Sequence, residues 1–288
     1  MTEVATSAMS DQLLVIIDPV ARRTDGESVR IAKDVLSAGA ATKVCLPDGP
    51  EEFARALQRR GSRRPVVIGD DRALVRAVSL LHRRRELAGS VLAVVPVGTS
   101  LGLASALGVP TSAVSAARAV LEGAERRLDL LVDDSDGVVL GALRIPPVPL
   151  GRAGAAVARA PWLRTCQSLV RTLVPVRPAR VASAPAPGPA RLRVEVDGST
   201  LVDLGQPVEG VSVTPGGSGA AEVEVRPLSV GAAAAPLRAQ GRTVTVSGTD
   251  FRYHSDAGVS GPVRTRTWRV REGAWGLMLP GGITPPAR

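Results

Sequence analysis

The chain has 288 residues, with 36 Lys and Arg against 27 Asp and Glu, which gives a formal net charge of +9. This length predicts two domains, and the 44% of hydrophobic residues is enough for two aliphatic cores. Nearly all of the positive charge is arginine, and aromatic residues are only 2% of the chain, too few for the aromatic platforms of nucleic-acid-binding modules, so we expect no nucleic-acid partner.

Short apolar runs alternate with helix-compatible stretches over the first part of the chain. After a loose tail over residues 1–11, four strands are predicted: Leu13–Ile17 ending at Asp18-Pro19, Thr42–Leu46, Pro65–Ile68 ending at Gly69, and Val91–Val95 ending at Pro96. A loop follows the first strand. Helices are predicted between successive strands, over Ser28–Leu36, Pro50–Arg60 and from Ala73 to Arg85. This alternation predicts an α/β domain over residues 12–128, with a parallel sheet covered by helices. The loops after its first, third and fourth strands should share the carboxyl edge of the sheet, where ligands usually bind.

After residue 128 the pattern changes to short, often alternating strands separated by turns. These strands are predicted at residues 130–132, 138–140, 191–196, 199–204, 208–213, 221–225, 243–247 and 266–270. They predict an antiparallel β-sandwich domain over residues 129–288, and the final strand could return to the first domain. A Pro/Ala-rich loop is predicted near 175–190.

Other features bear on location and partners. Cys45 and Cys166 are far apart, and two histidines cannot complete a standard zinc site, so no metal site is expected from Cys and His. No long uncharged apolar run and no secretory leader pattern is found, so we expect a cytoplasmic protein. Residues 151–174 place several arginines beside Trp162, a pattern that either lies in an anionic membrane interface or packs on the sandwich as a surface helix.

Four segments resemble the diacylglycerol kinase catalytic family. Leu14–Pro19 is similar to the family's strand that ends in Asn-Pro, and Val66–Ala73 stands where the family has a strand followed by Gly-Gly-Asp-Gly-Thr. Pro96–Pro110 aligns without a gap with Pro-x-Gly-Thr-x-Asn-Asp-Phe-Ala-Arg-x-Leu-Gly-Ile-Pro, and Thr243–Pro280 resembles the family's last strands. The resemblance implies an NAD kinase/diacylglycerol kinase-like α/β domain, a β-sandwich domain, and a cleft between them where ATP and Mg²⁺ serve transfer of a phosphoryl group to a lipid hydroxyl.

The resemblance also implies positions for the site. The expected nucleotide-binding residues are Asp18, Pro19, Gly69, Asp70, Asp71, Arg72, Pro96, Gly98 and Thr99. The family's general base is an Asp in the sandwich domain, and its position here is held by Ser218, with Glu222 or Glu224 as weaker candidates. Asp256 matches the Asp of a later Asp-Gly-Glu segment, and a turn role is the alternative for it.

The phosphate loop departs from the family pattern. The second Gly is replaced by Asp70, the next Gly by Arg72 and the Thr by Ala73. A carboxylate about 4 Å from a phosphate charge costs roughly 4 kcal/mol at an effective dielectric of 20, near a thousandfold in affinity. Arg72 could offset this cost by neutralising Asp70 or by binding phosphate itself. Alternatively, the segment is a tight acidic turn that binds nothing.

The remaining motifs also differ. Leu101 holds the place of the family's Asn and cannot hydrogen-bond a nucleotide. Asp18 replaces the Asn beside Pro19, so a group that donates and accepts becomes one that only accepts. Ser218 without a partner cannot take a proton at neutral pH.

These observations leave three hypotheses. The first is a family member with degraded motifs that binds nucleotide, lipid or a partner with little or no turnover. The second is an active ATP-dependent lipid kinase that uses Asp71, Thr99 and a sandwich carboxylate. The third is an interaction domain with an empty cleft.

Overall fold

The structure is a computed structural model that describes residues 12–146, 189–229 and 235–281. The tail over residues 1–11, the 151–174 segment, Cys166, and all but the last two residues of the 175–190 loop lie outside the described residues. Among the described residues, no helix combines the length and the apolar character that crossing a bilayer requires.

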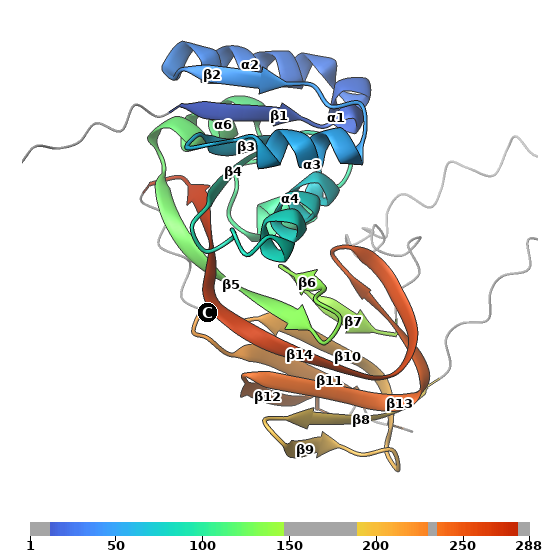
Figure 1. Cartoon of the computed structure of the whole chain (residues 1–288). Coiled ribbons are helices and arrows are strands. Elements are labelled where there is room, and N and C mark those ends of the chain that lie inside the picture. The colour runs from blue at the N-terminus through green and yellow to red at the C-terminus, as the bar shows by residue number, and fades with distance from the viewer. Residues whose placement is uncertain (1–11, 147–188, 230–234, 282–288) are drawn as a thin grey trace, which may run out of the picture.

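The first domain is an α/β unit whose strands alternate with helices (Figure 1). Its elements are β1 (Leu13–Ile17), α1 (Pro19–Thr24), α2 (Gly26–Gly39), β2 (Thr42–Cys45), α3 (Pro50–Gln58), β3 (Arg64–Gly69), α4 (Asp71–Arg83), β4 (Val91–Pro96), α5 (Gly102–Ala106) and α6 (Ala113–Glu122). The four strands pair in parallel in the order β4-β3-β1-β2. Because α2 packs against α6 and α3 against α4, helices cover both faces, and β1 is buried along its whole length.

The second domain is antiparallel and β-rich. Its strands are β5 (Ala124–Asp133), β6 (Val138–Val139), β7 (Leu143–Ile145), β8 (Ala190–Val196), β9 (Ser199–Val202), β10 (Pro207–Pro215), β11 (Ala221–Pro227), β12 (Leu237–Gly241), β13 (Thr243–Ser255) and β14 (Gly258–Leu279). Apolar and polar residues alternate along several of them, most clearly β11, so one face packs inward. They enclose a second hydrophobic core that includes Trp268.

One long strand joins the two domains. The first part of β14 pairs with β13, and its last residues add to the parallel sheet, with Gly276 opposite Val91 and Leu277 opposite Leu92 of β4. β5 runs antiparallel to β14 along both parts. As a result Trp275 belongs to the first core although Trp268, seven positions earlier, belongs to the second.

The structure corrects the sequence predictions at the helix starts. Residues 19–24, predicted as a loop, form α1, because the side chain of Asp18 accepts a hydrogen bond from the Val20 N–H and Pro19 occupies the first helical position. Helix α4 begins at Asp71, two residues before the predicted Ala73, because Asp70 is its N-cap. Both differences lie at the predicted ligand edge.

Candidate functional site

Asp18 follows β1 at the carboxyl edge of the sheet and is buried, with its side chain 3% exposed. One carboxylate oxygen accepts from the Val20 N–H at 2.8 Å, so Asp18 caps α1. The other accepts from Arg76 Nη1 of α4 at 2.9 Å, and the Arg76 guanidinium also lies 5.5 Å from the centre of the Phe53 ring. The charge of Asp18 is therefore neutralised within the protein.

Asp70 follows β3 and caps α4. Its Oδ1 accepts from the Ala73 N–H at 3.1 Å, and its carbonyl oxygen accepts from the Ala73 and Leu74 N–H groups. The Asp71 N–H donates to the Ser100 carbonyl oxygen at 2.9 Å. A phosphate at a helix N-terminus relies on these first N–H groups and on the positive end of the dipole. Here the protein's own oxygens accept from two of those donors, the Asp71 and Ala73 N–H groups, and Asp70 supplies the negative charge.

Asp71 is 8% exposed and links the loop after β3 to the loop after β4. Its two oxygens accept from the Leu103 N–H at 2.9 Å and the Ala104 N–H at 3.0 Å, at the start of α5, and from the Ser100 hydroxyl at 3.2 Å. Three aspartates, Asp18, Asp70 and Asp71, thus cap three helices at one edge of the sheet. We call them the edge aspartates.

The two glycines of the matched motifs are packed against protein. A Cβ atom on Gly69 would lie 2.7 Å from the Ala73 Cβ and 3.0 Å from the Asp18 Cβ. A Cβ atom on Gly98, whose φ is +136°, would lie 3.1 Å from the Asp70 Cβ. Glycine is needed at both positions so that the edge aspartates and α4 can approach the backbone there.

The other predicted nucleotide-binding residues surround this edge. Pro96 is buried at the end of β4, Pro19 is half-buried at the start of α1, and Thr99 is exposed. Arg72 is exposed and makes no ion pair with any described residue, so it does not neutralise Asp70. The structure therefore brings all nine predicted positions to one edge, as the parallel topology implies, but most of the polar groups there are already paired.

Asp256 of the second domain faces the same edge. It lies in the turn between β13 and β14, and its Oδ2 accepts from the Leu140 and Gly141 N–H groups at 2.6 Å and 2.8 Å. Burial raises the pKa of Asp256 above its ordinary value of 3.8, and the charge of Asp71 raises it further, against the lowering effect of the two backbone donors. A carboxyl group with a raised pKa at a domain junction is a feature of proton-transfer sites and also of structural turns.

Ser218 is placed elsewhere. It is exposed in the turn between β10 and β11, and the neighbouring Gly219 N–H donates to Asp129, which also accepts from the Gly273 N–H. Arg127 donates to the carbonyl oxygens of Gly273 and Ala88. Ala88 precedes β4, whereas Pro96 ends it, so this turn lies at the amino end of β4. The six residues of the strand, roughly 17 Å at about 3.3 Å per residue, separate it from the edge aspartates.

The two glutamates considered as substitute bases are also not at the edge. Glu222 is exposed on β11 and lies opposite Gln240 of β12. Glu224 forms ion pairs with Arg226 and Arg238, and the hydrogen bond from Arg226 lowers the pKa of its carboxyl group. Neither contacts Asp71 or Asp256.

Sequence reasoning missed Arg76 and the backbone donors at Leu140 and Gly141. Arg76 lies one helical turn beyond Arg72 on α4. Its role becomes clear only in the folded chain, where it forms an ion pair with the buried carboxylate of Asp18. The Leu140 and Gly141 N–H groups carry no side-chain signal and are found only when the chain is folded. A buried acidic residue at a strand end was the one usable clue, because such a group requires a partner.

The residues present do not fit a nucleoside triphosphate with its metal. The Asp71 and Ala73 N–H groups at the start of α4 already have protein acceptors, Asp70 lies against Gly98, and the Asp70 carboxylate adds a negative charge at this helix start. Within the described residues there is also no group of three or more His, Cys, Asp or Glu side chains placed to hold a metal ion. We therefore derive no phosphoryl-transfer step at this edge.

Comparisons with known proteins agree on the fold. The family model of the diacylglycerol kinase catalytic domain matches residues 12–132. A crystal structure of a diacylglycerol kinase from Bacillus anthracis is similar with a TM-score of 0.68 at 12% identity, covering 95% of this chain and 98% of that one. A putative diacylglycerol kinase from the same organism is similar with a TM-score of 0.69 at 13% identity over 95% and 98% of the two chains. No curated protein matches the sequence.

The family match covers the α/β domain and the start of the antiparallel region, and the structural similarity extends over both domains. The resemblance drawn from the sequence motifs and the predicted fold class are both confirmed. Residues 12–132 of this chain belong to the diacylglycerol kinase catalytic domain family.

Proposed function

We propose that this protein is a non-catalytic member of the lipid kinase family, with degraded ATP-binding motifs, which acts by binding rather than by phosphoryl transfer. The observation that carries the proposal is the cap of α4: the Asp70 carboxylate holds the Ala73 N–H where a phosphate would bind. Lipid is the ligand class that family membership supports. A cytoplasmic location with peripheral contact at an anionic membrane surface belongs to the same proposal.

Electrostatics supports this reading over nucleotide binding. A phosphate charge about 4 Å from the Asp70 carboxylate would be repelled by roughly 4 kcal/mol at an effective dielectric of 20. Asp18 adds a second carboxylate, although Arg76 neutralises it. Arg72 is exposed and forms no ion pair with the described residues, so it does not offset the charge of Asp70.

The proposal is tested by incubating the protein with labelled ATP, Mg²⁺ or Mn²⁺, and vesicles that contain diacylglycerol. We expect no labelled phosphatidate. A companion variant, Asp70→Gly/Arg72→Gly/Ala73→Thr, restores the family sequence and should gain ATP affinity, by up to about a thousandfold if Asp70 dominates the repulsion. Asp25→Gly is the control for loss of a capping carboxylate, because Asp25 caps α2 through the Ser28 N–H and should leave ATP affinity unchanged.

Two results would count against the proposal. Formation of labelled phosphatidate by the unaltered protein would refute the proposal directly. A restored variant that still fails to bind ATP, while folding normally, would show that Asp70 is not what excludes the nucleotide.

A second candidate, an active ATP-dependent lipid kinase, is favoured by one observation, the raised pKa of Asp256 close to Asp71. A carboxyl group whose pKa lies nearer neutrality is a better general base for a lipid hydroxyl. If the assay above detects turnover, Asp256→Asn should abolish it, and Ser218→Ala should leave it unchanged because Ser218 lies at the other end of β4.

A further inference from the structure

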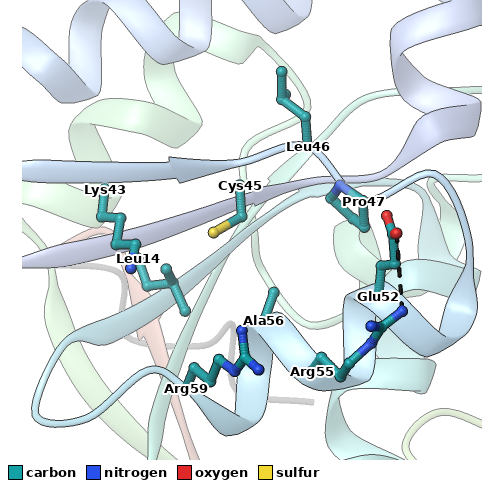
Figure 2. Close-up of a pocket in the computed structure, with 9 residues that line it drawn as sticks. All are labelled: Leu14, Lys43, Cys45, Leu46, Pro47, Glu52, Arg55, Ala56 and Arg59. Carbon is teal, nitrogen blue, oxygen red and sulfur yellow. Dashed lines mark ion pairs between the residues drawn. The ribbon is translucent and has the colours of Figure 1, made fainter.

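A groove outside the family cleft lies between the edge strand β2 and helix α3 (Figure 2). It has a volume of about 330 Å³. Its floor is formed by apolar or small side chains, those of Leu14, Cys45 and Ala56, and its rim carries the basic side chains of Lys43, Arg55 and Arg59 (Figure 2). We call it the β2 groove.

The rim of the β2 groove has an excess of unpaired positive charge. Its single carboxylate, Glu52, lies 3.8 Å from Arg55 and accepts from the Asp48 N–H at the start of α3, so it is committed to its own helix. Lys43 and Arg59 are both exposed, and neither forms an ion pair with any described residue. Two cations without partners beside an apolar floor favour a ligand with carboxylates and apolar groups.

The backbone beside the groove belongs to a strand that has one neighbour among the strands of the described residues. β2 is the last strand of the sheet, and its pairing partner is β1. An edge strand presents N–H and C=O groups that can pair with an added strand. Val44, on the opposite face of β2 from Lys43 and Cys45, is 38% exposed, so an added strand would find an apolar contact there as well.

We propose that the β2 groove is a docking site for an extended acidic segment of a partner protein, which adds to β2 as a further strand. Side chains of a strand alternate between faces, so carboxylates at every second position reach Lys43, Arg55 and Arg59. The apolar residues between them pack on the Val44 face. This proposal does not depend on whether the family cleft is catalytic.

Charge complementarity also selects against a second copy of this chain. Pairing of β2 with β2 would bring two basic rims together, and like charges at an interface oppose association. A lysine on an exposed edge strand is a common protection against such self-pairing. An acidic partner removes the repulsion and leaves the backbone edge available.

The test uses a fluorescent peptide of alternating glutamate and valine with the full-length protein. We expect saturable binding, measured by anisotropy, that weakens at least about tenfold in Lys43→Glu/Arg59→Glu, because both unpaired cations are reversed. Arg252→Glu/Arg269→Glu is the matched control: it makes the same change in net charge at exposed positions of β13 and β14, and it should leave the affinity unchanged.

A second peptide separates strand addition from charge alone. The same sequence with N-methyl groups at alternate residues keeps its charge but lacks the backbone N–H donors along one of its edges. If that edge is the one that pairs with β2, we expect this peptide to bind at least about tenfold more weakly than the unmethylated peptide. Equal binding of both peptides, or equal binding by wild type and Lys43→Glu/Arg59→Glu, would overturn the proposal. So would a β2-dependent dimer in sedimentation, or vesicles of phosphatidylglycerol that occupy the groove while the peptide does not.

Discussion

At the scale of single residues, each edge aspartate accepts hydrogen bonds from backbone N–H groups at the start of a helix. Asp71 is the clearest case, because both of its oxygens accept from buried N–H groups of α5. Replacing Asp71 with Ala would leave the Leu103 and Ala104 N–H groups without acceptors. We expect a loss of about 2–4 kcal/mol in the free energy of unfolding, measured with urea. Asp25→Ala, at an exposed cap, should cost only about 1 kcal/mol.

Asp256 should give the protein a distinctive pH dependence. The pKa of Asp256 in the folded protein is raised above the ordinary 3.8 that it has in the unfolded chain. At pH values between the unfolded and the folded pKa, the folded state therefore binds more protons than the unfolded state. Stability from this group is therefore present at low pH and is lost as pH rises through the folded pKa. Asp256→Asn keeps an oxygen for the Leu140 and Gly141 donors and removes the charge.

Urea unfolding of both proteins across pH tests this expectation. The Asn variant should be the more stable protein at neutral pH, and the difference should shrink to nothing below about pH 3.8, the ordinary value. A constant difference at all pH values, or a less stable variant at pH 7, would mean that the ionised carboxylate is favoured by its surroundings.

At the scale of elements, α1 and α4 are tied together by Asp18 and Arg76. Arg76→Met would leave a carboxylate that is 3% exposed without its cation. Since the Arg76 side chain is itself 35% exposed and partly screened by solvent, we expect a cost of about 2 kcal/mol, below that of a fully buried pair. The double variant Asp18→Asn/Arg76→Met should recover at least half of that loss in a double-mutant cycle. Additive losses would show that the pair is not coupled.

The junction between α6 and the strands that join the domains depends on one small residue. A Cβ atom on Gly123 would lie 2.2 Å from the Ala119 carbonyl oxygen and 2.3 Å from that of Leu279, and both are backbone atoms. We expect Gly123→Ala to lower the free energy of unfolding by at least about 3 kcal/mol. Gly26→Ala, in the first turn of α2 with open space around it, should be neutral or stabilise by about 0.5 kcal/mol. Similar effects at both sites would contradict the tight packing at the end of β14.

At the scale of the whole molecule, β5 and β14 pass through both cores, so we expect the domains to unfold together. Two tryptophans report on the two cores separately: Trp275 in the first and Trp268 in the second. In each single-tryptophan protein, made by changing the other tryptophans to Phe, the fluorescence midpoint in guanidinium should coincide with the midpoint followed by far-ultraviolet circular dichroism of the whole chain. Separated midpoints would show that the shared strands do not couple the domains.

Much of the fold follows from local pattern. The buried strands at Leu13–Ile17 and Arg64–Gly69 were predictable because they are apolar on both faces, and parallel pairing then brings Asp18 and Asp70 to one edge. The cap at Asp18 could have been recognised from the Asp-Pro pair, which is a common helix start. The partners of these aspartates could not, because Arg76 is distant in sequence from Asp18 and a backbone donor such as Leu103 N–H has no sequence signature. The position of Ser218 depends on long-range strand pairing, which the local pattern does not specify.

The central claim is that the protein's own carboxylates occupy the place of the nucleotide phosphates. Calorimetric titration of the unaltered protein with Mg-ATP tests this most directly. We expect no saturable heat up to about 1 mM nucleotide, the upper end of ordinary enzyme substrate affinities. Saturable one-to-one binding of ATP at micromolar concentration would contradict the account.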